Sequence, residues 1–172
     1  SPKNLFRNPI KKRFTPFVVA HETHEIKGFS DWWVCEGHLR RKRIVFRIIG
    51  NPLIGMGHIY RALTLAHEIN DHEIIFLCTE DEKLAVSKIA GRDYRIESVR
   101  SDSLVKRIRE LKPALVVNDC LNTSSKYVSA LAKSNIKTLN FEDFGPGSKL
   151  ADVVINELYD APLSKGENIN WG

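Results

Sequence analysis

Beyond residue 43, short apolar runs alternate with amphipathic stretches along the chain. The apolar runs are short and rich in β-branched residues, which is typical of strands buried in a parallel sheet. The stretches between them have the apolar spacing of helices, and several open with a polar capping residue. The alternation predicts an α/β fold, a Rossmann-like parallel sheet with crossover helices. The predicted strands are 44–49, 73–77, 94–97, 114–118, 137–141 and 153–155, and the predicted helices are 57–70, 81–90, 101–111 and 124–134.

The segment before residue 44 does not have this alternation. A short strand is predicted at 17–19, and Ser30 is expected to cap a helix that contains the adjacent Trp32 and Trp33. A segment of this length is too small to fold alone. We therefore expect a short strand/helix segment and linker over 1–43, followed by the Rossmann-like domain over 44–172.

No further helix or strand is predicted after the strand at 153–155, although the chain continues to residue 172. The pattern therefore contains one Rossmann-like half and no second domain. We expect the chain to be a fragment of a longer protein.

Composition fits a folded domain, because 42% of the 172 residues are hydrophobic and can bury a core. The formal charge of +5 owes much to the basic run at 40–43. That run has no interleaved aromatic residues or glycines, so we interpret it as a solvated helix end or linker and expect no nucleic-acid partner.

The three cysteines lie far apart and form no CxxC pair, which argues against a disulfide framework or a zinc site and for a reducing, cytoplasmic setting. No apolar run has the length needed to span a bilayer, and the first residues lack the apolar core of a signal peptide, so no membrane partner is expected. The cysteines are Cys35, Cys78 and Cys120.

A glycine-containing turn joins the first predicted strand to the first predicted helix of the domain. Gly55 and Gly57 lie just before His58 in this turn. Glycines let backbone amides approach a ligand, and the start of a helix favours negative charge. Tyr60 occupies the position of the third glycine of a dinucleotide fingerprint, so no dinucleotide cofactor, or any other cofactor, is expected.

His58 and Arg61 lie in the first turns of that predicted helix. The positive end of the helix dipole disfavours the protonated imidazole, so His58 is a candidate general base; a capping histidine without chemistry is the alternative. Arg61 lies on roughly the same face and is a candidate to hold a phosphate or sugar hydroxyl, with an ordinary surface arginine as the alternative.

Acidic residues follow two other predicted strands. Asp119 ends one of them, Glu142 and Asp143 follow another, and Asn156 follows the last. Parallel strands share their carboxyl edge with the glycine turn, so these side chains are expected to converge on His58 and bind substrate or orient the imidazole. For each aspartate taken alone, capping of the following segment is the alternative.

His21 and His24 do not have the spacing of the HExxH metal motif, and no third ligand is near in sequence. No metal site is therefore expected.

Residues 44 to about 162 resemble the N-terminal half of the PseG and SpsG hydrolases. PseG enzymes hydrolyse UDP-2,4-diacetamido-2,4,6-trideoxy-β-L-altropyranose, and SpsG proteins belong to spore coat polysaccharide biosynthesis. The matching stretches are 54–61 with 63–66, 117–119, and 141–143 with 151–156.

This resemblance implies a GT-B fold and a catalytic role for His58, which would position or deprotonate the water that displaces UDP. It implies a UDP-sugar substrate, a place in nonulosonic (sialic acid-like) surface polysaccharide synthesis, and a second GT-B domain that supplies most UDP contacts. The chain alone is then expected to be inactive or nearly so. The family more often has Asp-Asp where this chain has Glu142-Asp143.

Residues 8 to about 41 are similar to the tail of a CMP-sialic acid synthetase, a cytidylyltransferase that occurs fused ahead of such hydrolases. Where that tail often has Asp-Ile-Asp, this chain has Glu25 and Lys27. The remnant carries no cytidylyltransferase chemistry that the sequence can support.

Two other functions fit the same pattern. A related GT-B glycosyltransferase would use a sugar hydroxyl in place of water, and the loops that decide this are not predictable from sequence. Alternatively, the chain is a non-catalytic domain that docks on a synthetase or on a second copy through its basic N-terminal arm and Trp32-Trp33. Exposed tryptophans would favour that function, and buried ones would make them core. The oligomeric state is open, a homodimer included.

Overall fold

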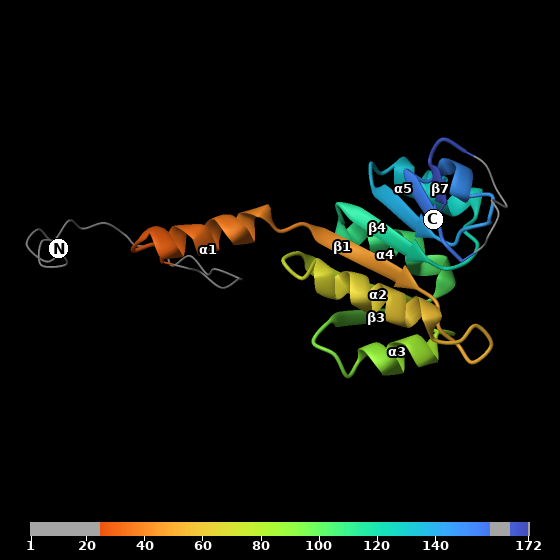
Figure 1. The fold of residues 1–172 in the computed structure, drawn as a ribbon, viewed down its shortest axis with the longest axis horizontal. Helices are drawn as coiled ribbons and strands as arrows, with labels where there is room; N and C mark the ends of the chain where they lie inside the picture. The colour runs from red at the N-terminus through yellow and green to blue at the C-terminus, as the bar shows by residue number, and fades with distance from the viewer. Residues whose placement is uncertain (1–24, 159–165, 172) are drawn as a thin grey trace, which may run out of the picture. The chain divides into compact units, whose positions relative to one another are not determined.

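A parallel sheet of seven strands forms the centre of the part of the chain that the computed structural model describes, residues 25–158 and 166–171. The strand order is β3-β2-β1-β4-β5-β6-β7 (Figure 1). The strands are β1 (Arg43–Ile48), β2 (Glu73–Thr79), β3 (Arg95–Val99), β4 (Leu115–Asp119), β5 (Lys137–Phe141), β6 (Val153–Asn156) and β7 (Ile169–Trp171).

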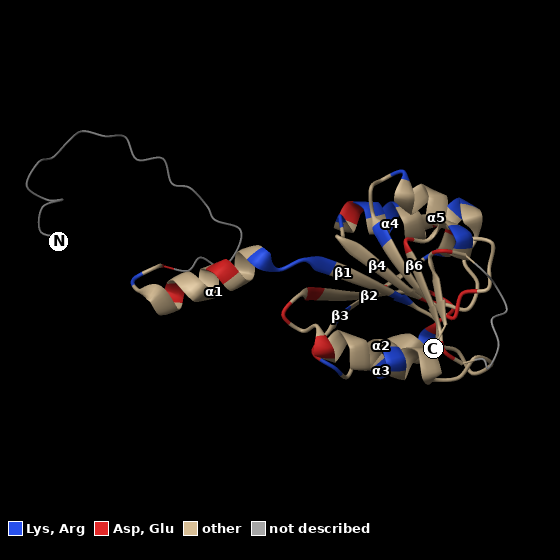
Figure 2. Cartoon of the chain, turned by 45° about the horizontal axis from the view of Figure 1, so that its top comes forward, with Lys and Arg blue, Asp and Glu red and all other residues tan. Residues whose placement is uncertain are grey.

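Helices cover both faces of this sheet, α2 and α3 on one face and α4 and α5 on the other (Figure 2). Alternate residues of each strand point to opposite faces. Val45 therefore packs in the core beneath α4 and α5, whereas Phe46 packs in the core beneath α2 and α3. The helices are α2 (Gly57–Glu68), α3 (Lys83–Ile89), α4 (Leu104–Leu111) and α5 (Ser125–Ala132), with short 3-10 turns η2 (Ser101–Ser103) and η3 (Ser148–Leu150).

The predicted α/β fold class is confirmed, with each predicted strand and helix of the sheet present and its ends shifted by a few residues. The expectation that no strand follows β6 is wrong. β7 pairs in parallel with β6, with Ile169 opposite Val154 and Trp171 opposite Asn156. Three residues with one central asparagine are too short to give a detectable apolar run, and the strand forms because Ile169 is buried in the core.

The strand order places the topological switch point between β1 and β4. The chain leaves β1 toward α2 on one face and leaves β4 toward α5 on the other face. Ligands of open α/β sheets bind at such a point, outside the carboxyl ends of the strands. The turn before His58 and the end of β4 lie together there.

The chain divides into two compact units, Ser1–Leu39 and Arg40–Gly172. The described part of the first unit contains all but the last residue of α1 (Phe29–Arg40). The prediction that Ser30 caps this helix is wrong, because the helix begins at Phe29 and Asp31 Oδ2 accepts hydrogen bonds from the backbone amides of Lys27 (2.8 Å) and Gly28 (3.0 Å). The strand predicted at 17–19 lies outside the described residues, as do His21 and His24.

Within the described ranges, none of the helices has the length and apolar character that a membrane span requires.

Candidate active site at the carboxyl ends of β1 and β4

The turn after β1 is held by hydrogen bonds from its backbone amides to the side chains of Asn51 and Glu82. Asn51 Oδ1 accepts from the amides of Leu53 (3.1 Å) and Ile54 (3.2 Å), and Glu82 Oε2 accepts from the amide of Gly50 (2.6 Å). Gly55 has φ +85°, a left-handed conformation that residues with a Cβ rarely adopt. The turn therefore reaches α2 in one defined conformation, and Gly55 is needed for it.

Gly57 is the first residue of α2, and neither its φ nor its surroundings require a glycine. A Cβ at Gly57 would meet no described atom within 4 Å, and its φ is not in the left-handed region. Met56 precedes it and makes no side-chain hydrogen bond to the first turn of the helix. The start of α2 therefore presents uncapped amides and open space, which suits an anionic or sugar group.

His58 is buried in the first turn of α2, with its ring against the end of β4. Its Nδ1 lies 2.5 Å from Oδ1 of Asp119, which is also buried. A carboxylate accepts only, so Nδ1 donates to Asp119 and Nε2 is the ring nitrogen that this contact leaves free. Asp119 thereby fixes the tautomer that a base acting through Nε2 requires, and it stabilises positive charge that develops on the ring.

Arg61 binds the same carboxylate from the next turn of α2. Its Nε lies 2.8 Å from Asp119 Oδ2 and its Nη2 lies 2.5 Å from Oδ1, a bidentate pair. The guanidinium also lies over the ring of Phe141, 5.2 Å from its centroid. The hydrogen bonds to Asp119 raise the pKa of Arg61. Arg61 therefore balances the buried charge of Asp119 and holds it against His58.

Glu142 lies beside this group and has an unusual conformation. It is fully buried immediately after β5 and has φ +49°, which is rare outside glycine. Its Oε1 accepts from the amide of Glu157 (2.9 Å) and lies 3.5 Å from Arg61 Nη1, whereas its Oε2 has no hydrogen-bond partner among the described residues. Backbone strain and an unsatisfied buried oxygen are features that concentrate at functional sites.

Asp143 and Asn156 hold the neighbouring loops together. Asp143 accepts hydrogen bonds from Thr123, from Asn140 Nδ2 (2.6 Å) and from the amide of Gly145 (2.9 Å). Asn156 Oδ1 accepts from the amide of Asp143 (3.1 Å). The hydrogen bonds of these two residues thus support the loop that follows β5.

The structure therefore brings four of the predicted site residues into one network and places two glycines directly before it. The network contains His58, Arg61, Asp119 and Glu142; Gly55 and Gly57 precede it. Sequence reasoning missed Glu82, which holds the turn at Gly50 from the start of α3. An acidic residue before a helix is usually assigned to capping, so nothing in the pattern pointed to this contact.

Among the described residues, no group of three or more histidine, cysteine, aspartate or glutamate side chains could hold a metal ion. The arrangement instead offers an oriented imidazole, a paired carboxylate and helix-start amides, which suit proton transfer from water beside an anionic group.

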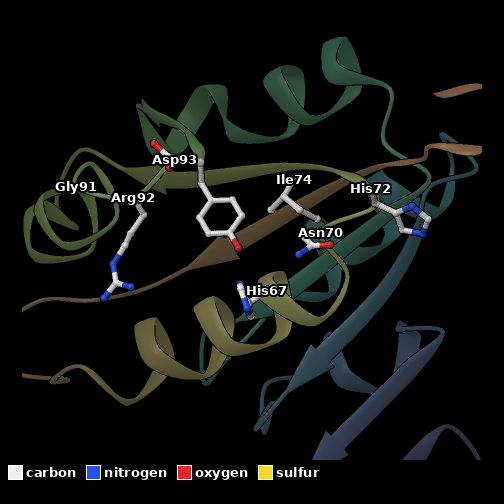
Figure 3. A pocket seen from close by; sticks show the side chains of 8 residues that line it. His67, Asn70, His72, Ile74, Gly91, Arg92 and Asp93 are labelled. Carbon is white, nitrogen blue, oxygen red and sulfur yellow. The ribbon is translucent and has the colours of Figure 1, made fainter. Parts of the chain in front are cut away.

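A cavity of about 520 Å³ lies elsewhere, between the end of α2, the start of β2 and the loop before β3 (Figure 3). Its lining includes His67, His72 and Arg92. It is at the amino end of β2, so it is separate from the His58 network, which is at the carboxyl ends of β1 and β4.

Comparisons with known proteins support the fold. No protein-family model matches the chain. The "Uncharacterized protein MJ1062" of Methanocaldococcus jannaschii is 32% identical over 119 residues, which is 66% of this chain and 24% of that protein. The chain thus spans about a quarter of the length of the curated relative that it matches.

Among solved structures, the crystal structure of Acinetobacter baumannii MurG matches with a TM-score of 0.58 and 13% identity, over 76% of this chain and 45% of that chain. At this identity the likeness concerns the fold alone. The sheet and its helices have the fold of a GT-B N-terminal domain.

Proposed function

We propose that this chain is the His58-bearing, N-terminal half of a GT-B nucleotide-sugar hydrolase of the PseG/SpsG type. Its substrate would be a UDP-linked diacetamido-trideoxy sugar, from which water displaces UDP, in the synthesis of a sialic acid-like surface sugar. The observation that carries the proposal is the buried His58–Asp119 pair at the uncapped start of α2.

In the proposed reaction, His58 Nε2 accepts a proton from water as the water oxygen attacks the anomeric carbon. The bond between that carbon and the UDP oxygen breaks, UDP leaves with the electron pair, and the configuration inverts. Asp119 stabilises the imidazolium that forms, and Arg61 holds Asp119 in place. The open amides at Gly57 would face an anionic or sugar group of the substrate.

The second half of the enzyme is part of the proposal. The chain spans about a quarter of the MJ1062 protein. In an enzyme of the proposed type, a C-terminal domain would supply most of the UDP contacts. We therefore expect turnover from the full-length protein and little or none from residues 1–172 alone.

A glycosyltransferase with the same fold would put a sugar hydroxyl where the hydrolase puts water. The test is UDP release by the full-length protein from UDP-2,4-diacetamido-2,4,6-trideoxy-β-L-altropyranose, with the sugar product identified by mass spectrometry. Free sugar and equal UDP without any acceptor support hydrolysis. UDP release that requires an added acceptor would replace the hydrolase by a transferase.

A docking role for the first unit is the second candidate, and the tryptophans favour it. Trp32 is 56% exposed and Trp33 is 66% exposed, and α1 has no buried residue in the structure. We propose that residues 1–43 are the tail of a cytidylyltransferase-like domain and that α1 packs against the rest of such a domain in the full-length protein. If α1 packs in this way, Trp33→Ala should make α1 more susceptible to limited proteolysis in the full-length protein. The fold of residues 44–172 should not change.

A further inference from the structure

Arg47 is a partly buried cation on the face of the sheet opposite to His58. It lies in β1 between Phe46 and Ile48, which pack under α2 and α3, so its side chain points to the α4 and α5 face. The guanidinium carbon lies 4.5 Å from the centroid of the Tyr127 ring in α5. Tyr127 is itself fixed, because its hydroxyl donates to Asn118 Oδ1 (2.7 Å).

No carboxylate of the described residues forms an ion pair with Arg47 within 4.0 Å. Cys120, Tyr127 and Asp143 act on its charge without forming an ion pair, and the oxygens of Asp143 already accept from Thr123, Asn140 and Gly145. A cation that is removed from water without a paired anion is costly. An anionic ligand would supply the missing partner.

The space in front of Arg47 can hold such a ligand. A cavity of about 560 Å³, within the usual size range of small-molecule sites, is lined by Arg47 and by a second cation, Lys126. Leu104, Val105 and Ala130 give it an apolar wall. Asp102 also lines it, but that carboxylate is paired with Arg100 at 2.8 Å.

The position also suits a ligand. Thr79, the last residue of β2, lines the cavity. The cavity therefore lies at the carboxyl edge of the sheet, where α/β folds bind their ligands. The amide of Tyr127 in the first turn of α5 is already bonded to Ser124 Oγ, so the positive charge comes mainly from the two side chains.

We infer that this cavity binds a small organic anion. Its carboxylate or phosphate lies against Arg47 and Lys126, and its apolar part lies against Leu104 and Val105. The inference is independent of the function proposed for His58.

The test is the binding of two probes, phenyl phosphate and benzoate, to the chain by isothermal titration calorimetry, with benzyl alcohol as the uncharged analogue. Saturable binding of at least one anion and none of the alcohol is expected, and the tighter anion identifies the ligand as a phosphate or a carboxylate. Arg47→Met should weaken binding roughly tenfold or more, as expected for loss of a charge-assisted hydrogen bond.

Exposed Lys126→Met should weaken binding several-fold, and it keeps the test decisive if Arg47→Met fails to fold. Lys106→Met, an exposed residue of α4 outside the cavity, is the matched control and should bind like the wild type. Absence of saturable binding, or affinity unchanged by Lys126→Met and by any folded Arg47→Met, would overturn the inference.

Discussion

Nδ1 of His58 lies 2.5 Å from Oδ1 of Asp119, although 61 positions separate the two residues in sequence. The strand order produces this contact. β1 and β4 are neighbours, with Ile48 opposite Asp119, and α2 begins just beyond the end of β1. The pair is therefore a product of the topological switch point, and its chemistry can be tested one residue at a time.

Asp119→Asn should abolish most turnover of the full-length protein while leaving KM nearly unchanged. An asparagine keeps the shape but can donate to Nδ1, which favours the wrong tautomer, and it cannot stabilise the imidazolium. We expect kcat to fall by on the order of a hundredfold or more, measured as UDP release. The exposed Asp71→Asn serves as control. Turnover close to the wild type for Asp119→Asn would show that the pair is structural only.

Gly57→Ala should separate stability from activity. The added Cβ meets nothing within 4 Å, so the thermal unfolding midpoint should stay the same or rise. The free energy of unfolding should increase by less than about 1 kcal/mol. UDP release should fall, because the methyl group occupies the space proposed for the substrate.

Gly55→Ala is the contrasting variant. Its φ of +85° predicts a loss of stability of about 1–2 kcal/mol, measured by urea unfolding. If Gly57→Ala had full activity, the start of α2 would not be the place where substrate binds.

Much of the fold could be predicted from sequence, because buried parallel strands and amphipathic helices leave strong patterns. The strand β7 could not, since its burial depends on a neighbour that the local pattern does not contain. The site was predictable as far as its edge of the sheet, because Asp119 and Glu142 end or follow strands. Residue types alone do not specify the positive φ of Glu142 or the bidentate hydrogen bonding of Arg61 to Asp119, because both depend on packing in three dimensions.

The ion pair between Glu97 and Arg107 predicts a pH dependence of stability. Hydrogen bonds from Arg107, at 2.6 and 2.9 Å, hold the pKa of Glu97 below its usual value. A carboxylate with a depressed folded-state pKa contributes stability above its unfolded pKa, about 4.3, and loses it as the pH falls through the folded-state pKa. Glu97→Gln should therefore unfold at a lower urea concentration than wild type at pH 7.

At a pH below the folded-state pKa of Glu97, the two proteins should unfold at the same urea concentration. Glu80 is an exposed residue directly after β2, and Glu80→Gln should unfold at the same urea concentration as the wild type at either pH. A difference between wild type and Glu97→Gln that persisted unchanged into acid would indicate a packing effect in place of the ion pair.

The most direct test of the account is UDP release from UDP-2,4-diacetamido-2,4,6-trideoxy-β-L-altropyranose by the full-length wild type, His58→Ala and His67→Ala, with folding checked by circular dichroism. His67 is an exposed histidine of the same helix. The account predicts that His58→Ala loses at least roughly a hundredfold in kcat and that His67→Ala keeps wild-type turnover. Wild-type turnover in a folded His58→Ala, or no UDP release by the wild type itself, would contradict it.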